Sequence, residues 1–513
     1  MFRAFFFFCF FFLCWRLNLP RIILDQDCEE REKQKTDHFE FWSCIKFNLD
    51  QVILLLLVFQ GRPLLTIYQE ELFVLKMIET PKLVISMTLL LAACAFAAPV
   101  TPPLNPTVPR SGAAAPYRSL GSFSVKQPGF LNFAPVVQPG TGETDLWLMI
   151  SSFTGNPLGS EGEVYAVPNI SSAIRNVPAI APVSLLEYLW PNEVAPIPRE
   201  VFGDNFVTVA GGFLVPGKSN GVLSAVRISD VSNVTTIKLS TDKKGYFYHM
   251  CEWYDVNGDG KLDVVAARAT KPLTGAGSGE LLWLEQPRNP FTDAWTEHVL
   301  FAGPDVFFRV ADVNNDGVIE IFAAQFFTSK LVLYTAPRGN LTNPSSYATR
   351  VIDDSIGPLF DVKILDLNAD GRVDLLITDH TDDEKLSGVY GYEIPNDLAQ
   401  GTFVKHIIAQ GFKTTEPGTN QASPGAPEAF YPQVKSTSGK PSILLAGDGA
   451  QSAYLISPNT QTSSDWSYEL DVVIDVKHTV GQIAVEDVDG DGWSEFFVPD
   501  YTGGEIYVYT FAP

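Results

Sequence analysis

One acidic phrase recurs four times in the second half of the chain, and it constrains the fold more than any other feature. The phrase is Asp-x-Asn/Asp-x-Asp-Gly-x-x-Asp/Glu, and its copies span residues 255–263, 312–320, 366–374 and 487–495. Asp, Asn and Gly favour turns, so a single copy would be read as a solvated hairpin turn. Four copies with the last acid at the same offset indicate instead a shared ligand.

The spacing of the copies predicts the architecture. From Asp255 to Asp312 is 57 residues, from Asp312 to Asp366 is 54, and from Asp366 to Asp487 is 121, about two periods. A period near 55 residues with strand-like segments inside it is typical of β-propeller blades. The missing copy survives as residues 434–442, which keep Gly439 but no carboxylate. Weaker strand patterns near residues 145 and 210 bring the count to seven four-stranded blades in an all-β fold, with six or eight left open.

The chemistry of the phrase predicts calcium. Calcium takes six to eight oxygen ligands, and side-chain oxygens at positions 1, 3, 5 and 9 converge when the loop coils around one point. Glycine at position 6 permits the sharp turn. An EF-hand would need a bidentate Glu at position 12, but that position holds Ala266, Ala323, Ile377 and Val498, within strand-like segments. Each loop is therefore expected to join two strands.

The four loops and the apolar strand after each resemble the FG-GAP/VCBS repeats of integrin α-chain propellers and of many secreted microbial proteins. The resemblance covers about residues 130–511 and implies a seven-bladed propeller with structural Ca²⁺ between the first two strands of several blades. The ligands that it implies are the side chains at positions 1, 3, 5 and 9 and the backbone carbonyl at position 7. In the four loops these are Asp255, Asn257, Asp259, Lys261 and Asp263; Asp312, Asn314, Asp316, Val318 and Glu320; Asp366, Asn368, Asp370, Arg372 and Asp374; and Asp487, Asp489, Asp491, Trp493 and Glu495.

The N-terminal hundred residues predict secretion. Residues 77–97 combine Lys82, an apolar run and a small-residue cleavage pattern at Ala95 and Ala97, as in a signal peptide. Residues 1–76 share no pattern with the rest, and we expect translation to start at Met77; the alternative is that Arg3 and the Phe-rich run after it form a signal sequence of their own. Residues 98–117 read as a Pro-rich linker, which leaves residues 118–513 for the propeller. Sequons at Asn169, Asn233 and Asn340 are compatible with glycosylation.

Cysteine positions exclude a disulfide scaffold. Five of the six cysteines lie before residue 98, so only Cys251 remains in the body, where it is expected to be a buried core thiol. The formal charge of −23 argues against a nucleic-acid partner, which would require a Lys/Arg surface.

Residues just before each loop are expected to line the central channel, where propellers usually bind ligands. We nominate His249, Glu252, Arg309, Asp361 and Lys363 as candidate ligand-binding residues there. Ordinary polar lining of a watery channel is the alternative interpretation. No catalytic residue is identified, because nucleophile elbow, HExxH, P-loop and dinucleotide motifs are absent.

Three functions remain open at this point. The preferred hypothesis is a secreted, non-catalytic module that binds an extracellular glycan or protein, with no stable membrane anchor in the mature chain. The alternative is a carbohydrate-active enzyme, similar to a lyase or dehydratase, that uses the channel mouth. The third hypothesis is a surface adhesion scaffold. It is the least favoured, because no anchor sequence is seen after the final strand at residues 505–510.

Overall fold

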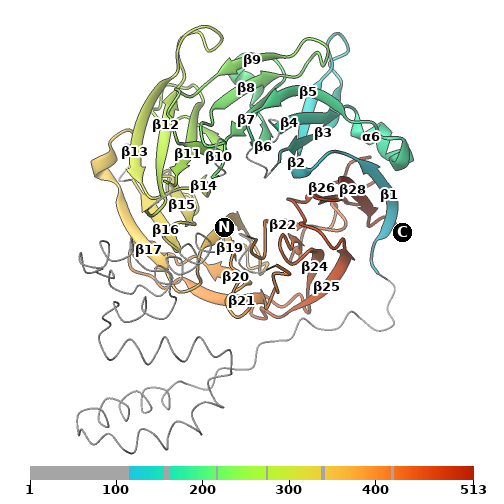
Figure 1. Cartoon of the computed structure of the whole chain (residues 1–513). Coiled ribbons are helices and arrows are strands. Elements are labelled where there is room, and N and C mark those ends of the chain that lie inside the picture. The colour runs from blue at the N-terminus through green and yellow to red at the C-terminus, as the bar shows by residue number, and fades with distance from the viewer. Residues whose placement is uncertain (1–114, 155–161, 215–217, 273–274, 337–340, 417–420) are drawn as a thin grey trace, which may run out of the picture. The chain divides into compact units, whose positions relative to one another are not determined.

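The computed structural model describes residues 115–154, 162–214, 218–272, 275–336, 341–416 and 421–513. Residues 1–76, the predicted signal peptide at residues 77–97, most of the linker and the sequon at Asn340 therefore lie outside the described residues. The described part forms seven antiparallel four-stranded sheets arranged as blades around a ring, which confirms the predicted fold (Figure 1).

Strands follow one another in chain order within each blade. Blades 1 and 2 contain β2 (Pro128–Val137), β3 (Thr144–Ser152), β4 (Gly162–Val167) and β5 (Val183–Tyr188), then β6 (Pro191–Pro196), β7 (Phe206–Gly211), β8 (Leu223–Arg227) and β9 (Thr235–Lys238). Blades 3 and 4 contain β10 (Phe247–Tyr254), β11 (Asp263–Thr270), β12 (Ser278–Glu285) and β13 (Thr296–Ala302), then β14 (Phe307–Ala311), β15 (Glu320–Gln325), β16 (Lys330–Thr335) and β17 (Ala348–Asp353). Blades 5 and 6 contain β18 (Leu359–Leu365), β19 (Asp374–Asp379), β20 (Gly388–Glu393) and β21 (Val404–Gln410), then β22 (Pro427–Phe430), β23 (Ser442–Ala446), β24 (Ser452–Pro458) and β25 (Tyr468–Asp475).

Blade 7 closes the ring by combining both ends of the described chain. It contains β26 (Ala484–Glu486), β27 (Glu495–Asp500), β28 (Glu505–Thr510) and, as the outermost strand, β1 (Arg118–Ser124). Tyr117, just before β1, packs edge-on against Phe496, Tyr509 and Phe511. This pairing ties the first described strand to the last blade, so the ring cannot open without breaking a sheet.

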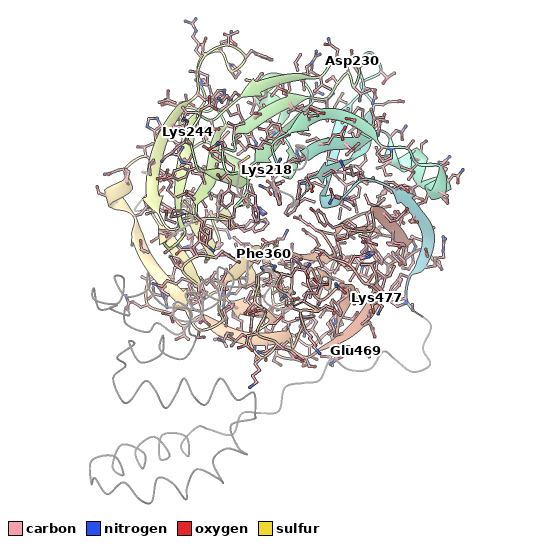
Figure 2. All side chains as sticks on the ribbon, in the orientation of Figure 1. Lys218, Asp230, Lys244, Phe360, Glu469 and Lys477 are labelled. Atoms are coloured by element: carbon pink, nitrogen blue, oxygen red, sulfur yellow. The ribbon has the colours of Figure 1, made fainter. Side chains whose placement is uncertain are left out.

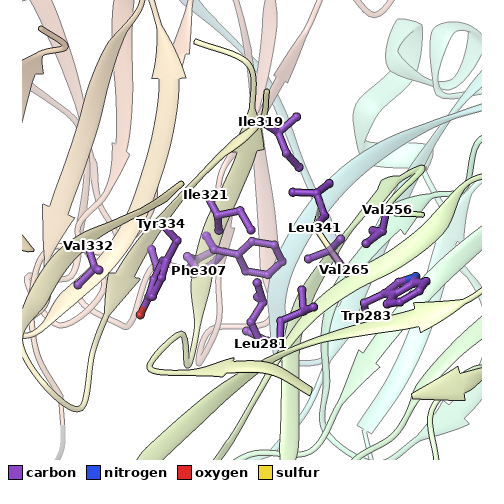
Figure 3. Close-up of a cluster of buried hydrophobic side chains, with 14 of the residues drawn as sticks. Val256, Val265, Leu281, Trp283, Phe307, Ile319, Ile321, Val332, Tyr334 and Leu341 are labelled. Atoms are coloured by element: carbon purple, nitrogen blue, oxygen red, sulfur yellow. The ribbon is translucent and has the colours of Figure 1, made fainter. Parts of the chain in front are cut away.

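Burial within each blade follows the position of the strand. The second and third strands are covered by neighbouring blades on both faces, and β11, β15 and β19 accordingly consist of almost uninterrupted buried residues. Between blades 3 and 4, Leu281, Trp283, Phe307 and Ile321 belong to one such buried cluster (Figure 3). Burying each of these side chains contributes about 1.5–3 kcal/mol.

The outermost strands share one irregularity. In blades 1, 3, 4, 5 and 6 the register between the third and fourth strands shifts by one residue at a β-bulge. Exposed aliphatic residues, among them Val299, Val351 and Ile407, lie at these bulges. Because a bulge bends a strand and interrupts its ladder, it protects the free sheet edge from pairing with another chain.

Short helical turns occupy some of the connections. They are α6 (Ile170–Ala173), η2 (Ile174–Ala179), α7 (Arg199–Phe202) and η4 (Pro344–Ser346). None of the helices in the described ranges is long and apolar enough to cross a membrane.

Candidate functional site

All first strands run in the same direction, so the ring has two distinct faces. We call the face with the loops between first and second strands the acidic-loop face, because the four acidic phrases join β10 to β11, β14 to β15, β18 to β19 and β26 to β27. The face with the loops between second and third strands is called the opposite face. The structure thus places the acidic loops where the sequence predicted them.

Each acidic loop is coiled by the same hydrogen bonds. In the first loop, Asp255 Oδ2 accepts from the Gly260 amide at 2.9 Å, and Asn257 Oδ1 accepts from the Asp259 amide at 2.9 Å. The corresponding bonds recur in the other three loops. Gly260, Gly317, Gly371 and Gly492 have φ values between +81° and +96°, which a side chain would strain. Positions 1, 3 and 5 therefore face one point.

The acid at position 9 lies below each loop and is almost fully buried. Its carboxylate accepts from the backbone amide of position 2, as in the bond from the Val488 amide to Glu495 Oε2 at 3.0 Å. Burial, together with the loop's own aspartates, raises the pKa of Glu320, Asp374 and Glu495 to about 7. Each loop therefore concentrates four oxygen-bearing side chains, most of them acidic, around one point.

The fourth loop shows most directly whether the oxygen atoms of an acidic loop are placed to hold calcium. Asp487, Asp489 and Asp491 bring carboxylate oxygens within 4.8 Å of one another. Asp487 Oδ1 is buried and has no hydrogen-bond partner, so it is an acceptor that a cation would satisfy. The other loops carry Asn at position 3 and hence one carboxylate fewer. The hard oxygen donors fit calcium, and ligand charge tunes its affinity.

The fourth loop also supports the neighbouring blade, whose own loop has lost its carboxylates. The Val434 amide donates to the Gly492 carbonyl at 3.1 Å, and Ser494 returns a hydrogen bond to the Pro432 carbonyl at 3.1 Å. The hydroxyl of Ser494 donates to the Tyr431 carbonyl at 2.9 Å. Blade 6 therefore depends on a loop of blade 7 for the order of its own turn.

Replacing Asp487 by Ala should consequently cost more stability than replacing Asp259 by Ala. Both substitutions remove a predicted calcium ligand and should lower the melting temperature and its calcium dependence, but only Asp487→Ala also releases Gly492. Thermal unfolding in excess calcium would measure the difference. Hydrogen exchange at the Val434 amide should accelerate in the Asp487 variant alone. Equal exchange in the two variants would contradict the coupling.

Charged side chains from five consecutive blades meet in the central channel, and we call them the channel charge cluster. They are Glu193 (β6), Glu252 (β10), Arg309 (β14), Asp361 and Lys363 (β18), and Glu428 (β22). Sequence reasoning found Glu252, Arg309, Asp361 and Lys363 but missed Glu193 and Glu428, because the blades that carry them have no acidic loop to set the register.

The cluster is connected by shared ion pairs. Arg309 lies 3.6 Å from Glu252 Oε1 and 3.5 Å from Asp361 Oδ1. Lys363 Nζ lies 3.5 Å from Asp361 Oδ2 and 2.6 Å from Glu428 Oε1. Asp361 is completely buried, whereas the other side chains of these pairs keep 19–24% of their surface open to the channel. Each cation is therefore already shared by two carboxylates.

The remaining nominated residue, His249, belongs to a different group. Its ring packs edge-on against Phe130 at 5.1 Å and Phe307 at 4.6 Å, and Phe360 packs on Phe307 at 5.3 Å. We call these four rings, which come from blades 1, 3, 4 and 5, the aromatic plug. Phe360 lies on the inner side of the ring of blades, whereas Asp230 lies on its outer rim (Figure 2). His249 is 2% exposed, and burial lowers its pKa to about 3, so its imidazole is neutral.

A run of packed aromatic rings, three of them stacked, lies beside the plug on the opposite face. Tyr501, Phe153, Trp190 and Phe213 follow one another with centroid distances of 5.3, 4.5 and 5.3 Å. We call this run the aromatic mouth. Three of its members, Phe153, Phe213 and Tyr501, are partly exposed and lie at the end of a second strand or just after it. The sequence analysis did not predict the aromatic mouth. Comparison of the blades just after the second strand would have revealed it, because an aromatic residue recurs there.

His298, Arg350 and His406 occupy equivalent positions in the outer strands β13, β17 and β21, away from the channel. His298 stacks on Trp283 at 4.3 Å, and His406 stacks on Trp466 at 4.1 Å. Arg350 lies over Phe403 at 5.0 Å. Cys251 is buried and free, as expected of a core thiol.

Comparison with known proteins supports the repeat assignment. Residues 255–323, which contain the first two acidic loops, match the family model described as FG-GAP-like repeat. The chain is a seven-bladed β-propeller in which residues 255–323 match the FG-GAP-like repeat. No curated protein sequence matches it significantly.

Solved structures with a similar arrangement include two dehydrogenases. The propeller is similar to the soluble aldose sugar dehydrogenase from Escherichia coli in the apo form, with 12% identity, a TM-score of 0.36, and coverage of 63% of this chain and 98% of that chain. A glucose dehydrogenase shows 10% identity, a TM-score of 0.33, and coverage of 64% and 99%. Sequence identities and TM-scores this low carry no information about function.

Proposed function

We propose that this FG-GAP-repeat propeller is an extracellular module that binds a glycan at the aromatic mouth, with calcium in the acidic loops bracing the blades. The observation that carries the proposal is the packed run of Tyr501, Phe153, Trp190 and Phe213. Ligand sites are typically lined by aromatic side chains with a few placed polar groups. Trp190 is covered by Phe153 and Phe213, so the partly exposed rings of Phe153, Phe213 and Tyr501 are the ones that a sugar would contact.

The mouth is built on a rigid base. The Tyr501 hydroxyl donates to the Phe153 carbonyl at 2.8 Å, which couples the loops of blades 7 and 1. Because the rings are already packed against one another, little conformational entropy is lost when a ligand binds. Secretion is part of the proposal and agrees with exposed sequons at Asn169 and Asn233. A protein ligand at the same mouth is the competing form of this proposal.

Replacing Phe213 by Ala should weaken glycan binding about tenfold, since each lost aromatic contact removes about 1 kcal/mol or more. A glycan array in calcium would identify the ligand, and calorimetry would compare the variants. Phe291→Ala is the matched control, because Phe291 is 50% exposed and packs on Phe202, away from the mouth. Equal effects of the two substitutions would rule out the mouth as the site. Failure of every glycan to bind would reject a glycan ligand.

One observation favours the enzyme alternative, a carbohydrate lyase or dehydratase. Burial raises the pKa of Glu193 to about 7, although Arg309 and Lys363 lower it. A carboxyl group of that pKa in the channel is suited to general acid–base chemistry near neutral pH. An absorbance assay for unsaturated products on any glycan that binds would decide between binding and cleavage.

A further inference from the structure

A cavity of about 140 Å³ adjoins the aromatic mouth on the opposite face. It is lined by the connection between β1 and β2 and by residues at the end of β3, the start of β4 and the end of β5. One of its walls is Phe153, which is also a ring of the mouth. An empty cavity of about 150 Å³ holds a benzene-sized molecule, so this one has room for a single six-membered ring.

The ring of Phe153 is fixed between the mouth and the cavity. Trp190 stacks on it at 4.5 Å, and Tyr501 packs against it at 5.3 Å. Gly129 lies against its edge, where an added Cβ would come within 2.2 Å of Phe153 Cε1. The ring nevertheless remains partly exposed. A chain of sugars that lies along the mouth would therefore reach the cavity at Phe153.

The polar side chains that line the cavity include charges of both signs. Lys126 and Glu187 are exposed, and neither forms an ion pair or a side-chain hydrogen bond with another residue that the structure describes. The amide group of Gln127 has no such partner either. Glu163 differs, because each of its carboxylate oxygens already accepts from a hydroxyl group. The cavity thus offers a ligand both donors and acceptors.

The connection between β1 and β2 is held in a strained conformation beside the cavity. Gln127 has a φ of +45°, in the left-handed region that side chains other than glycine rarely adopt. Two hydrogen bonds anchor this connection: Ser152 Oγ donates to the Lys126 carbonyl at 2.5 Å, and the Val125 amide donates to the Gly504 carbonyl at 2.9 Å. Backbone strain persists only where the surroundings impose it, and it is concentrated at ligand sites.

We propose that this cavity binds the terminal residue of the glycan and that this residue is an uncharged sugar. The inference rests on glycan binding at the aromatic mouth and adds the position of the chain end and the class of its sugar. An acidic sugar would bring its carboxylate toward Glu163 and Glu187, and the ammonium group of an amino sugar would meet Lys126. A hydroxyl group both donates and accepts, so a neutral ring of hydroxyls satisfies Lys126, Gln127 and Glu187 together.

Binding of single sugars to the full propeller in calcium tests the class of ligand. The neutral probes are the methyl glycosides of glucose, galactose and mannose, and the charged counterparts are those of glucuronic acid and glucosamine. Titration followed by NMR should show binding of at least one neutral probe, with both charged counterparts bound about tenfold more weakly, a difference of about 1.4 kcal/mol. Tighter binding of a charged counterpart, or no binding of any neutral probe, would overturn the proposal.

Substitutions of exposed residues locate the sugar. Lys126→Met and Glu187→Gln should each weaken binding of the neutral probe about tenfold and leave the fold intact, because both side chains are exposed and unpaired. Lys244→Met and Glu200→Gln are the matched controls at exposed positions that do not line the cavity, and they should change nothing. If the cavity variants and the controls behave alike, the sugar does not bind in this cavity.

Gln127→Gly separates a role in binding from a role in the fold. Glycine adopts a φ of +45° without strain, so the melting temperature should not fall, whereas loss of the amide should weaken sugar binding about threefold or more. Ser329→Gly is the control, because Ser329 has a φ of +53° in the turn between β15 and β16, far from the cavity in sequence. It should leave sugar binding unchanged.

Failure of this inference is distinguishable from failure of the proposed function. Phe213→Ala alters the mouth but no residue that lines the cavity. If Phe213→Ala weakens binding of a longer glycan while Lys126→Met and Glu187→Gln do not, the mouth binds the glycan and the cavity does not hold its end. If only the cavity variants weaken binding, the sugar binds in the cavity without the mouth, and the proposed function is wrong.

Discussion

Chelation of divalent cations is expected to lower the melting temperature of the propeller by about 10 °C or more. When the free ion concentration is 100 times the dissociation constant of a site, binding at that site stabilises the folded state by about 2.7 kcal/mol. Four loops have the predicted ligand pattern. Without the ions, each loop retains its clustered carboxylates, with a buried acid at position 9 beneath them. Their mutual repulsion then opposes the coiled conformation.

Thermal unfolding in calcium and in chelator measures this effect. Magnesium should restore less of the lost stability than calcium, because it demands a smaller octahedral site at 2.0–2.1 Å. A variant with Asp at position 1 replaced in all four loops should melt at the same temperature with and without calcium. Identical melting of the unaltered protein in calcium and chelator would contradict metal binding by the loops.

The success of the blade prediction has a local physical cause. Each acidic loop is a short contiguous segment whose side chains bond its own backbone, as Asp255 does to Gly260. The strand after it is buried on both faces and is therefore mostly apolar. Both features can therefore be recognised in the sequence without knowledge of the tertiary structure. The fifth copy at residues 434–442, which has lost its carboxylates, can be recognised in the same way.

Ring closure and the aromatic mouth depend on contacts between distant segments. β1, with the sequence RSLGSFS, has no apolar run, and it forms a strand because β28 offers it a free edge. Trp190 and Phe213 are far from Tyr501 in sequence and meet it only when the ring closes. Glu193 directly precedes the buried Val194, and nothing local indicates that it faces the channel. These features follow from the geometry of the ring rather than from any motif.

Arg309→Met is expected to destabilise the propeller by about 3–5 kcal/mol, the typical cost of leaving a buried charge without its partner. Arg309 lies between Glu252 of blade 3 and the fully buried Asp361 of blade 5, so its loss leaves Glu252 without an ion-pair partner among the described residues and Asp361 with Lys363 alone. Arg227→Met is the matched control. Arg227 pairs with Asp204 at 2.6 Å but is 40% exposed, and such surface pairs contribute about 1 kcal/mol or less.

Chemical denaturation of both variants would measure the difference, and a double variant would test its cause. If unpaired negative charge is responsible, adding Asp361→Asn to Arg309→Met should recover part of the lost stability, whereas Asp361→Asn alone should be destabilising. Such opposite signs are the mark of two side chains in one network. Additive losses would mean that Arg309 acts through its packing against Met250 rather than through its charge.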